Sequence, residues 1–207
     1  MKYWSLILVV LVILTAIPSF AVTRTSNGGN WSTPATWGGT VPAAGDDVIL
    51  ASGTTNVDAG LAASTTILSL TINGTAILDF NTANRTIVVT LVTTMNGNSL
   101  IDNSPNNNGG NKILSMLGDF NVPALQAARI DGITLTQPVA KNFTVSGNFQ
   151  PTNNKGTKTL GNLIVNKTGS WTATTNETYT FQGTSDLYEG CVISGASTGV
   201  ITMTGNV

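Results

Sequence analysis

The feature that most constrains this chain is a glycine that recurs two residues after an apolar side chain, at the end of one short β-branched run after another. The first four of these glycines are separated by 23, 21 and 29 residues. Glycine adopts a positive φ without a Cβ clash, so it suits a corner at which a strand ends. A repeat in the low twenties is typical of one coil of a solenoid, in which each coil buries its inward residues against its neighbours. The glycines are Gly74, Gly97, Gly118, Gly147, Gly195 and Gly205, with Gly169 as a weaker match.

Short apolar runs between glycine and asparagine clusters indicate many short strands and almost no helix. The exception is 122–129, where a proline near the start suits a single turn or a short helix. We therefore predict an all-β fold, a right-handed parallel β-helix (β-solenoid), with one domain over residues 22–207. A β-sandwich is the alternative, because it has a similar density of strands. The runs expected to form strands include 48–50, 67–74, 76–80, 86–92, 142–146, 162–166 and 179–181.

The first 21 residues have the pattern of a secretory signal peptide. Lys2 supplies the positive start, an apolar stretch runs from Leu6 to Ile17, and small residues precede a cleavage site after Ala21. The apolar stretch is shorter than the roughly 20 residues that span a bilayer, which argues against an uncleaved membrane anchor. We expect a protein that is extracellular or on the outer cell surface, with no membrane association after the signal peptide is removed.

The low charge of the chain limits its classes of partner. Charged residues make up 9% of the sequence, and the formal net charge is −1. Binding to nucleic acid requires a basic face, so we expect no nucleic-acid partner. Thr-x-Thr pairs, which are typical of flat ice-binding faces, occur at 134/136, 172/174 and 202/204. These pairs are not regularly spaced, and threonine is common on exposed strands, so ice binding is the weaker interpretation.

The residues that most enzymes use are missing or isolated. The chain has no histidine, which excludes Ser-His-Asp triads, Cys-His pairs and imidazole metal sites. A glycosidase needs two facing carboxylates a few ångströms apart, and no spacing of the acidic residues indicates such a pair. The basic residues that a polysaccharide lyase would use lie far apart in the sequence. We therefore predict that the protein is not an enzyme.

Asp46 and Asp47 follow a Pro-Ala-Ala-Gly turn and precede an apolar run. In one interpretation the carboxylates accept backbone N–H groups in the turn and start the strand. In the other they are a pair of calcium ligands, with Asp58 or Asp79 as a further ligand, because hard cations bind clustered oxygens. Calcium is the only cofactor that the sequence suggests.

Three tryptophans, Trp31, Trp37 and Trp171, are the candidate ligand-binding residues. Exposed indole rings can stack on the apolar faces of sugars. If Trp31 and Trp37 were buried, they would instead close one end of the core with a large apolar area. For Trp171 a position in the core is an equally strong alternative.

The segment 31–80 resembles a known family. Its two tryptophans, Pro42, the run Gly-Asp-Asp-Val-Ile at 45–49 and the leucines and glycine at 68–74 are similar to the opening of extracellular β-helix domains named for eight glycines. The runs 143–149 and 163–169 are similar to the repeats of secreted surface proteins of Gram-negative bacteria, which are exported by a dedicated sorting pathway. The resemblance implies an adhesin or a modular scaffold.

From these observations we expect a secreted, non-catalytic structural or adhesive β-solenoid at the cell surface or in the extracellular matrix. The alternative is a carbohydrate-binding module of a larger polysaccharide-active protein. The expected partner is an extracellular polysaccharide or a surface protein. The run 200–207 has the pattern of a strand without a capping helix or a charged edge after it. This pattern predicts either a longer protein or an open edge that self-associates end to end.

Overall fold

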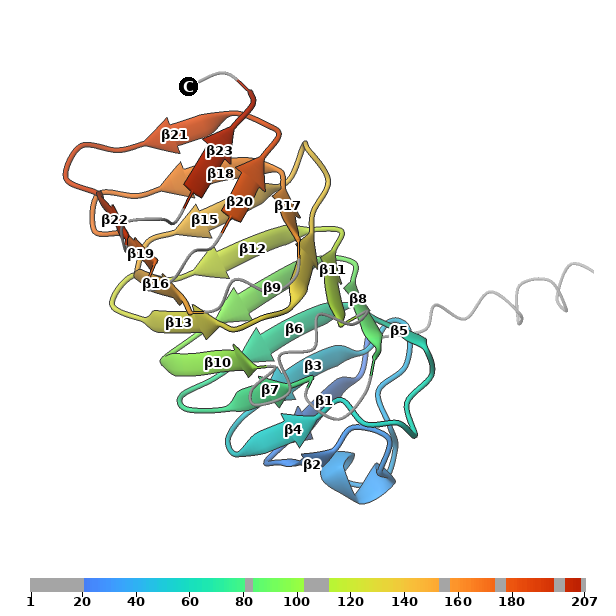
Figure 1. Ribbon diagram of the computed structural model, residues 1–207. Coiled ribbons are helices and arrows are strands. Elements are labelled where there is room, and N and C mark those ends of the chain that lie inside the picture. Colours follow the sequence, from blue (N-terminus) through green and yellow to red (C-terminus); the bar gives the residue numbers. More distant parts are fainter. Residues whose placement is uncertain are drawn as a thin grey trace, which may run out of the picture.

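The structure is a computed structural model, and it describes residues 21–80, 84–102, 112–152, 157–173, 178–195 and 200–205. The expected signal peptide lies outside the described residues except for Ala21, as does Thr174 of the Thr-x-Thr pairs. The described chain winds as a right-handed β-solenoid of three parallel sheets (Figure 1). This confirms the predicted fold class, and the β-sandwich alternative is wrong.

From β3 on, successive strands go to sheets A, B and C in turn, and neighbouring strands of each sheet pair in parallel, one coil apart. Sheet A contains β1 (Thr23–Ser26), β3 (Asp47–Leu50), β6 (Ser69–Ile72), β9 (Val92–Met95), β12 (Asp119–Val122), β15 (Asn142–Val145), β18 (Asn162–Val165) and β21 (Ser185–Leu187). Sheet B contains β2 (Gly29–Asn30), β4 (Thr54–Asn56), β7 (Ile77–Asp79), β10 (Asn98–Asp102), β13 (Ala127–Ile130), β16 (Asn148–Pro151), β19 (Ser170–Ala173) and β22 (Val192–Gly195). Sheet C contains β5 (Ser64–Ile67), β8 (Thr86–Val89), β11 (Ile113–Met116), β14 (Thr134–Thr136), β17 (Lys158–Leu160), β20 (Thr178–Phe181) and β23 (Val200–Met203).

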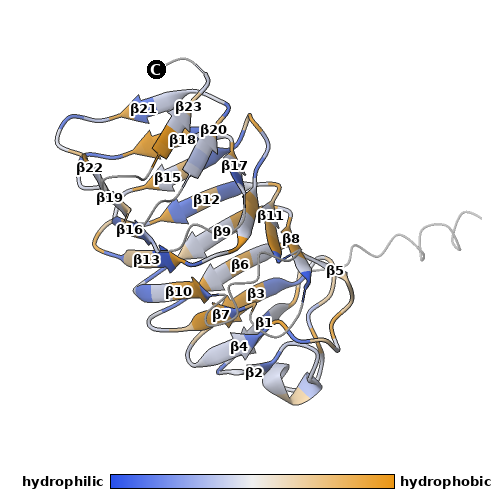
Figure 2. Cartoon of the chain, viewed as in Figure 1, coloured by the Kyte–Doolittle hydropathy of each residue, from blue (hydrophilic) through white to orange (hydrophobic). Residues whose placement is uncertain are grey.

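The core is a column of apolar side chains enclosed by the three sheets. Side chains alternate between the inside and the outside along each strand, so every second residue is buried. Figure 2 shows the result as hydrophobic and hydrophilic residues within single strands. Inward residues of neighbouring coils stack in register, as Phe120 does on Phe143, with ring centroids 4.3 Å apart. Burial and backbone ladders therefore hold the coils together without a disulfide, since the chain has a single cysteine.

Two of the predicted strands are each divided by a corner. In the run 67–74, the first residue is the last residue of β5, Leu68 forms the corner, and β6 follows. In the run 86–92, Thr90 and Leu91 form the corner between β8 and β9. The backbone stays hydrogen-bonded through these corners, because the Leu91 N–H donates to the Leu68 carbonyl one coil away, at 2.8 Å. The predicted turn or helix at 122–129 is a turn at 123–126 followed by β13, and no helix forms there.

Most of the recurring glycines stand at corners, in two columns rather than one, whereas Gly195 is the last residue of β22 in sheet B. Gly74 and Gly97 follow strands of sheet A and have positive φ values of 56° and 70°. Gly118 and Gly205 follow strands of sheet C, and there glycine is needed because a Cβ atom would meet the backbone of the neighbouring coil. A Cβ on Gly118 would overlap the carbonyl oxygen of Leu91 in the coil before it. The sequence therefore predicts some of the corners, but it merges two kinds of corner into one repeat and includes Gly195, which lies in a strand.

Candidate functional site

The three candidate ligand-binding tryptophans lie in the core. Trp31 and Trp171 have no exposed surface, and Trp37 is 4% exposed. Trp171 packs between Phe149 and Tyr179, with ring centroids at 4.6 Å and 4.7 Å. A buried ring offers no face to a sugar in solvent, so this burial argues against the sugar-stacking role and favours the core alternative.

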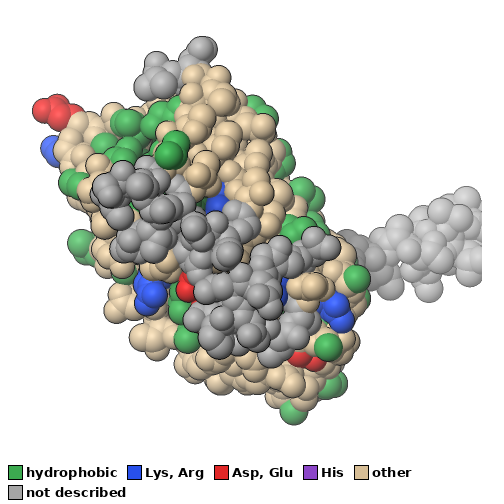
Figure 3. All heavy atoms as spheres, viewed as in Figure 1, with side chains coloured by type: hydrophobic (Ala, Val, Ile, Leu, Met, Phe, Trp, Pro, Cys, Tyr) green, Lys and Arg blue, Asp and Glu red, His purple; other side chains and the backbone are tan. Residues whose placement is uncertain are grey.

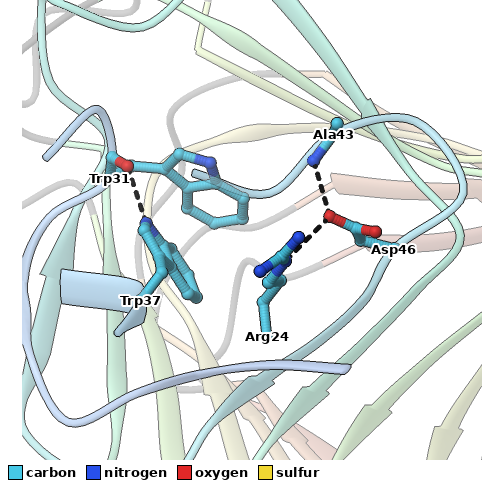
Figure 4. Close-up of polar contacts among 5 residues, drawn as sticks. All are labelled: Arg24, Trp31, Trp37, Ala43 and Asp46. Carbon is cyan, nitrogen blue, oxygen red and sulfur yellow. Dashed lines mark hydrogen bonds and ion pairs between the residues drawn. The ribbon is translucent and has the colours of Figure 1, made fainter. Parts of the chain in front are cut away.

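Trp31 and Trp37 close the N-terminal end of the described solenoid. The 3-10 helix η1 (Pro34–Trp37) lies at this end, in the place that sheet C occupies in the later coils (Figure 1). Figure 4 shows the two indoles side by side, and the Trp37 Nε1–H donates to the Trp31 carbonyl at 2.7 Å. Their rings meet edge to face, with centroids 4.9 Å apart. Residues 31–37 therefore act as a cap on the first coil.

Asp46 and Asp47 have separate partners in the structure. Asp46 Oδ2 accepts the Ala43 N–H at 3.0 Å and forms an ion pair with Arg24 at 3.2 Å (Figure 4). Asp47 is the first residue of β3, and its carboxylate accepts the hydroxyl of Ser69 in the next coil. The two carboxylates leave the chain on opposite sides, because Asp46 is buried at the corner and Asp47 faces outward. This geometry is that of the turn interpretation, and calcium binding at this pair stays a prediction.

Asp58, which the sequence suggested only as a further calcium ligand, is a carboxylate that holds the cap in place. Its Oδ1 accepts the Ser32 N–H at 2.9 Å, and its Oδ2 accepts the Ser32 hydroxyl at 2.6 Å and the Gly60 N–H at 3.0 Å. Burial alone would raise the pKa of Asp58, but these hydrogen bonds outweigh it and hold the pKa below its usual value of 3.8. Asp58 thus joins the second coil to the cap.

Two lysines lie near the solenoid interior. Lys158 is 2% exposed, and its Nζ lies 5.7 Å from the ring centroid of Tyr179. Burial lowers the pKa of Lys112, and nearby Asp79 partly offsets this effect. In the described part of the chain, no three acidic or cysteine side chains gather closely enough to hold a metal ion.

A groove of about 420 Å³ lies on the surface between sheets A and B. No titratable side chain lines it, so it offers no acid, base or nucleophile for a reaction. Its lining consists of Gly97, Asn98, Leu125, Gln126, Ala127, Gly147, Asn148, Thr168 and Ser170.

The outer face of sheet C is the most regular surface that the structure describes. Two outward columns cross its strands, and every position in them is threonine or serine except Val88, Ile113 and Val200. The first column contains Thr66, Val88, Ser115, Thr136, Thr159, Thr180 and Thr202. The second column contains Ser64, Thr86, Ile113, Thr134, Thr157, Thr178 and Val200. We call these two columns the threonine face.

The Thr-x-Thr pairs of the sequence coincide with this face only in part. Thr134 and Thr136 do lie together on the face. Thr172 instead lies in sheet B, and Thr204 stands at a corner, where its hydroxyl donates to the Phe181 carbonyl at 3.1 Å. The connections between sheets B and C differ in length, from 131–133 to 103–112, so threonines that stack in space are irregularly spaced in the sequence.

Comparisons with protein-family models, with curated proteins and with solved structures find no match. Among the described residues, no helix is long and apolar enough to cross a membrane. A functional argument for this chain therefore rests on the geometry of its own residues.

Proposed function

We propose that this protein is a secreted, non-catalytic β-solenoid with a structural or adhesive role at the cell surface or in the extracellular matrix. The signal-peptide pattern at 1–21 supports secretion, and the resemblance of 31–80 to extracellular β-helix domains supports a surface role. The solenoid supplies a rigid rod with long, repetitive faces.

One observation carries this proposal: the most regular surface that the described residues form is a repeat of short, uncharged polar side chains. The threonine face shows this repeat along the whole of sheet C. The carboxylates of Asp46 and Asp58 bind neighbouring backbone N–H groups, and the groove between sheets A and B has no titratable lining. Contact over many weak, repeated positions is the mode of binding that such a surface favours.

The experiment is to express the full chain with and without residues 1–21 in a secreting bacterial host. The proposal expects the full chain in the medium or on the cell surface, where it binds extracellular matrix or purified matrix polysaccharides without changing them. The chain without residues 1–21 should stay inside the cell. Depolymerisation of a polysaccharide by the pure protein would overturn the non-catalytic role, and retention of the full chain inside the cell would overturn the location.

Indole fluorescence separates this role from a carbohydrate-binding module. Because Trp31, Trp37 and Trp171 are buried, a bound glycan should leave their emission unchanged. Quenching of tryptophan emission on titration with a soluble glycan would instead favour the module.

A further inference from the structure

We propose that the threonine face is an ice-binding surface, whose ligand is the crystalline lattice of water. This inference goes beyond the structural or adhesive role and does not depend on it.

The threonine face presents hydroxyl and methyl groups on a two-dimensional grid. Neighbouring strands of a sheet lie about 4.8 Å apart, and alternate residues of one strand about 6.6 Å apart. Thr134 and Thr136 of β14 set the width of this grid, and Thr136, Thr159 and Thr180 continue it from coil to coil. Layers of water molecules in ice repeat with comparable spacings. Water held in rows between the two columns would therefore match the order of an ice surface.

Charge is absent from the two columns along the described strands of sheet C. Ice is a neutral lattice that excludes ions, so a charged side chain on the face would hold liquid-like water against the crystal. In the upper part of Figure 3, over β20 and β23, the surface is mostly in the colour of uncharged polar side chains and backbone. The three exceptions, Val88, Ile113 and Val200, are β-branched like threonine and keep a methyl group at the same place.

The face is stiff before it meets a ligand. Threonine is β-branched, so few χ1 rotamers are open to it and little side-chain entropy is lost on binding. Beneath the face, Leu114, Leu135, Leu160 and Phe181 are fully buried and pack in the core. Parallel pairing on both sides fixes the strands from β8 to β20. A stiff and repetitive face is what adsorption to a crystal requires.

The other two faces break the pattern, which shows that threonine on exposed strands does not alone account for it. The outward residues of sheet A include Asp47, Asp119 and Asp186. Those of sheet B include Asp79 and Arg129. Sheet A nevertheless holds one pair of threonines in adjacent strands, which supplies a matched control.

The test measures thermal hysteresis and the partition of the full chain into slowly grown ice. The wild-type protein should concentrate in the ice and shape growing crystals. The double variant Thr136→Lys/Thr159→Lys places two charges at the centre of the face, in adjacent strands. Thermal hysteresis should fall about tenfold or more, as when residues at the centre of an interface are replaced. The control Thr71→Lys/Thr94→Lys makes the same change on adjacent strands of sheet A and should keep the wild-type activity.

Cooperative thermal unfolding at the wild-type temperature shows that each variant is folded. If the double lysine variant does not fold, the single variant Thr159→Tyr, which keeps a strand-forming residue, gives the same comparison. Exclusion of the wild-type protein from ice would overturn the inference, as would equal losses in the sheet A control. Binding to crystalline chitin or cellulose in place of ice would assign the face to a polysaccharide and would also overturn it.

Discussion

At the scale of single residues, the positive φ values of the described chain fall on glycines, with Leu125 as the exception. Leu125 has a φ of 63°, and among the described residues it alone has a positive φ without being glycine. Its side chain is 96% exposed, so no packing offsets the strain. The turn at 123–126 is instead held by its neighbour Gln126, whose side-chain oxygen accepts the Gly97 N–H of the previous coil.

Replacing Leu125 with glycine should therefore stabilise the protein. The left-handed conformation costs a side chain about 1–2 kcal/mol, and the added backbone entropy of glycine offsets about half of this. We expect a gain of up to about 1 kcal/mol in the free energy of unfolding, measured by denaturant titration. Leu117→Gly is the control, since Leu117 is an exposed corner leucine without a positive φ, and it should lose stability. Equal effects of the two changes would contradict this explanation.

Gly118→Ala tests the second kind of corner. The new Cβ would overlap the Leu91 carbonyl oxygen, and a backbone group cannot move aside without breaking the sheet. We expect a loss of more than about 3 kcal/mol in the free energy of unfolding, or no soluble protein. Gly74→Ala should cost only about 1–2 kcal/mol, because Gly74 faces open space and only its φ is strained. Melting temperatures of the two variants measure the contrast, and a mild Gly118→Ala would refute it.

At the scale of elements, much of the fold could be predicted from the sequence, but the ends of several strands could not. Apolar alternation and corner glycines indicate the coils. Corners such as Leu68 and Leu91 carry neither glycine nor proline, and the neighbouring coil satisfies their backbone instead. That partner is more than twenty residues away, so a local pattern cannot reveal it. The threonine face was missed for the same reason, since only the pairing of Thr136 with Thr159 places them side by side.

The N-terminal cap should respond to acid through Asp58. Because the folded-state pKa of Asp58 lies below 3.8, its contribution to stability is fully present above that pH and is lost as the pH falls through the folded-state value. Asp58→Asn should lower the stability at neutral pH by about 1 kcal/mol, through weaker hydrogen bonds to Ser32. The melting temperatures of variant and wild type should converge below pH 3.8. The control is Asp186→Asn, on an exposed position of β21. Its melting temperature should stay close to that of the wild type at neutral pH.

At the scale of the whole molecule, the two ends of the described rod differ. The cap of Trp31 and Trp37 covers the first coil. At the other end β21, β22 and β23 are the outermost strands of their sheets, and Leu187 and Val192 are 42% and 52% exposed. An edge of this kind can pair with another chain, in keeping with the predicted end-to-end self-association.

Sedimentation velocity can test this association. We expect residues 22–207, expressed alone, to form larger species as their concentration rises, because the last described coil presents outermost strands and exposed apolar side chains. Leu187→Lys/Val192→Lys should keep the protein monomeric, since lysine on an edge strand opposes pairing. Leu91→Lys changes an equally exposed residue in the middle of the rod and should leave the association intact. Monomeric wild-type protein at every concentration would contradict the expectation.

The unequal connections between the sheets have a consequence for engineering. Two residues join β8 to β9 and β11 to β12, and the insertion of one residue there would turn inward side chains outward. Between sheets B and C the connection ranges from 131–133 to 103–112, while the strands on either side keep their register. Foreign peptides could therefore be grafted along that one edge, once per coil, to give a display array whose spacing is set by the rise of the coils.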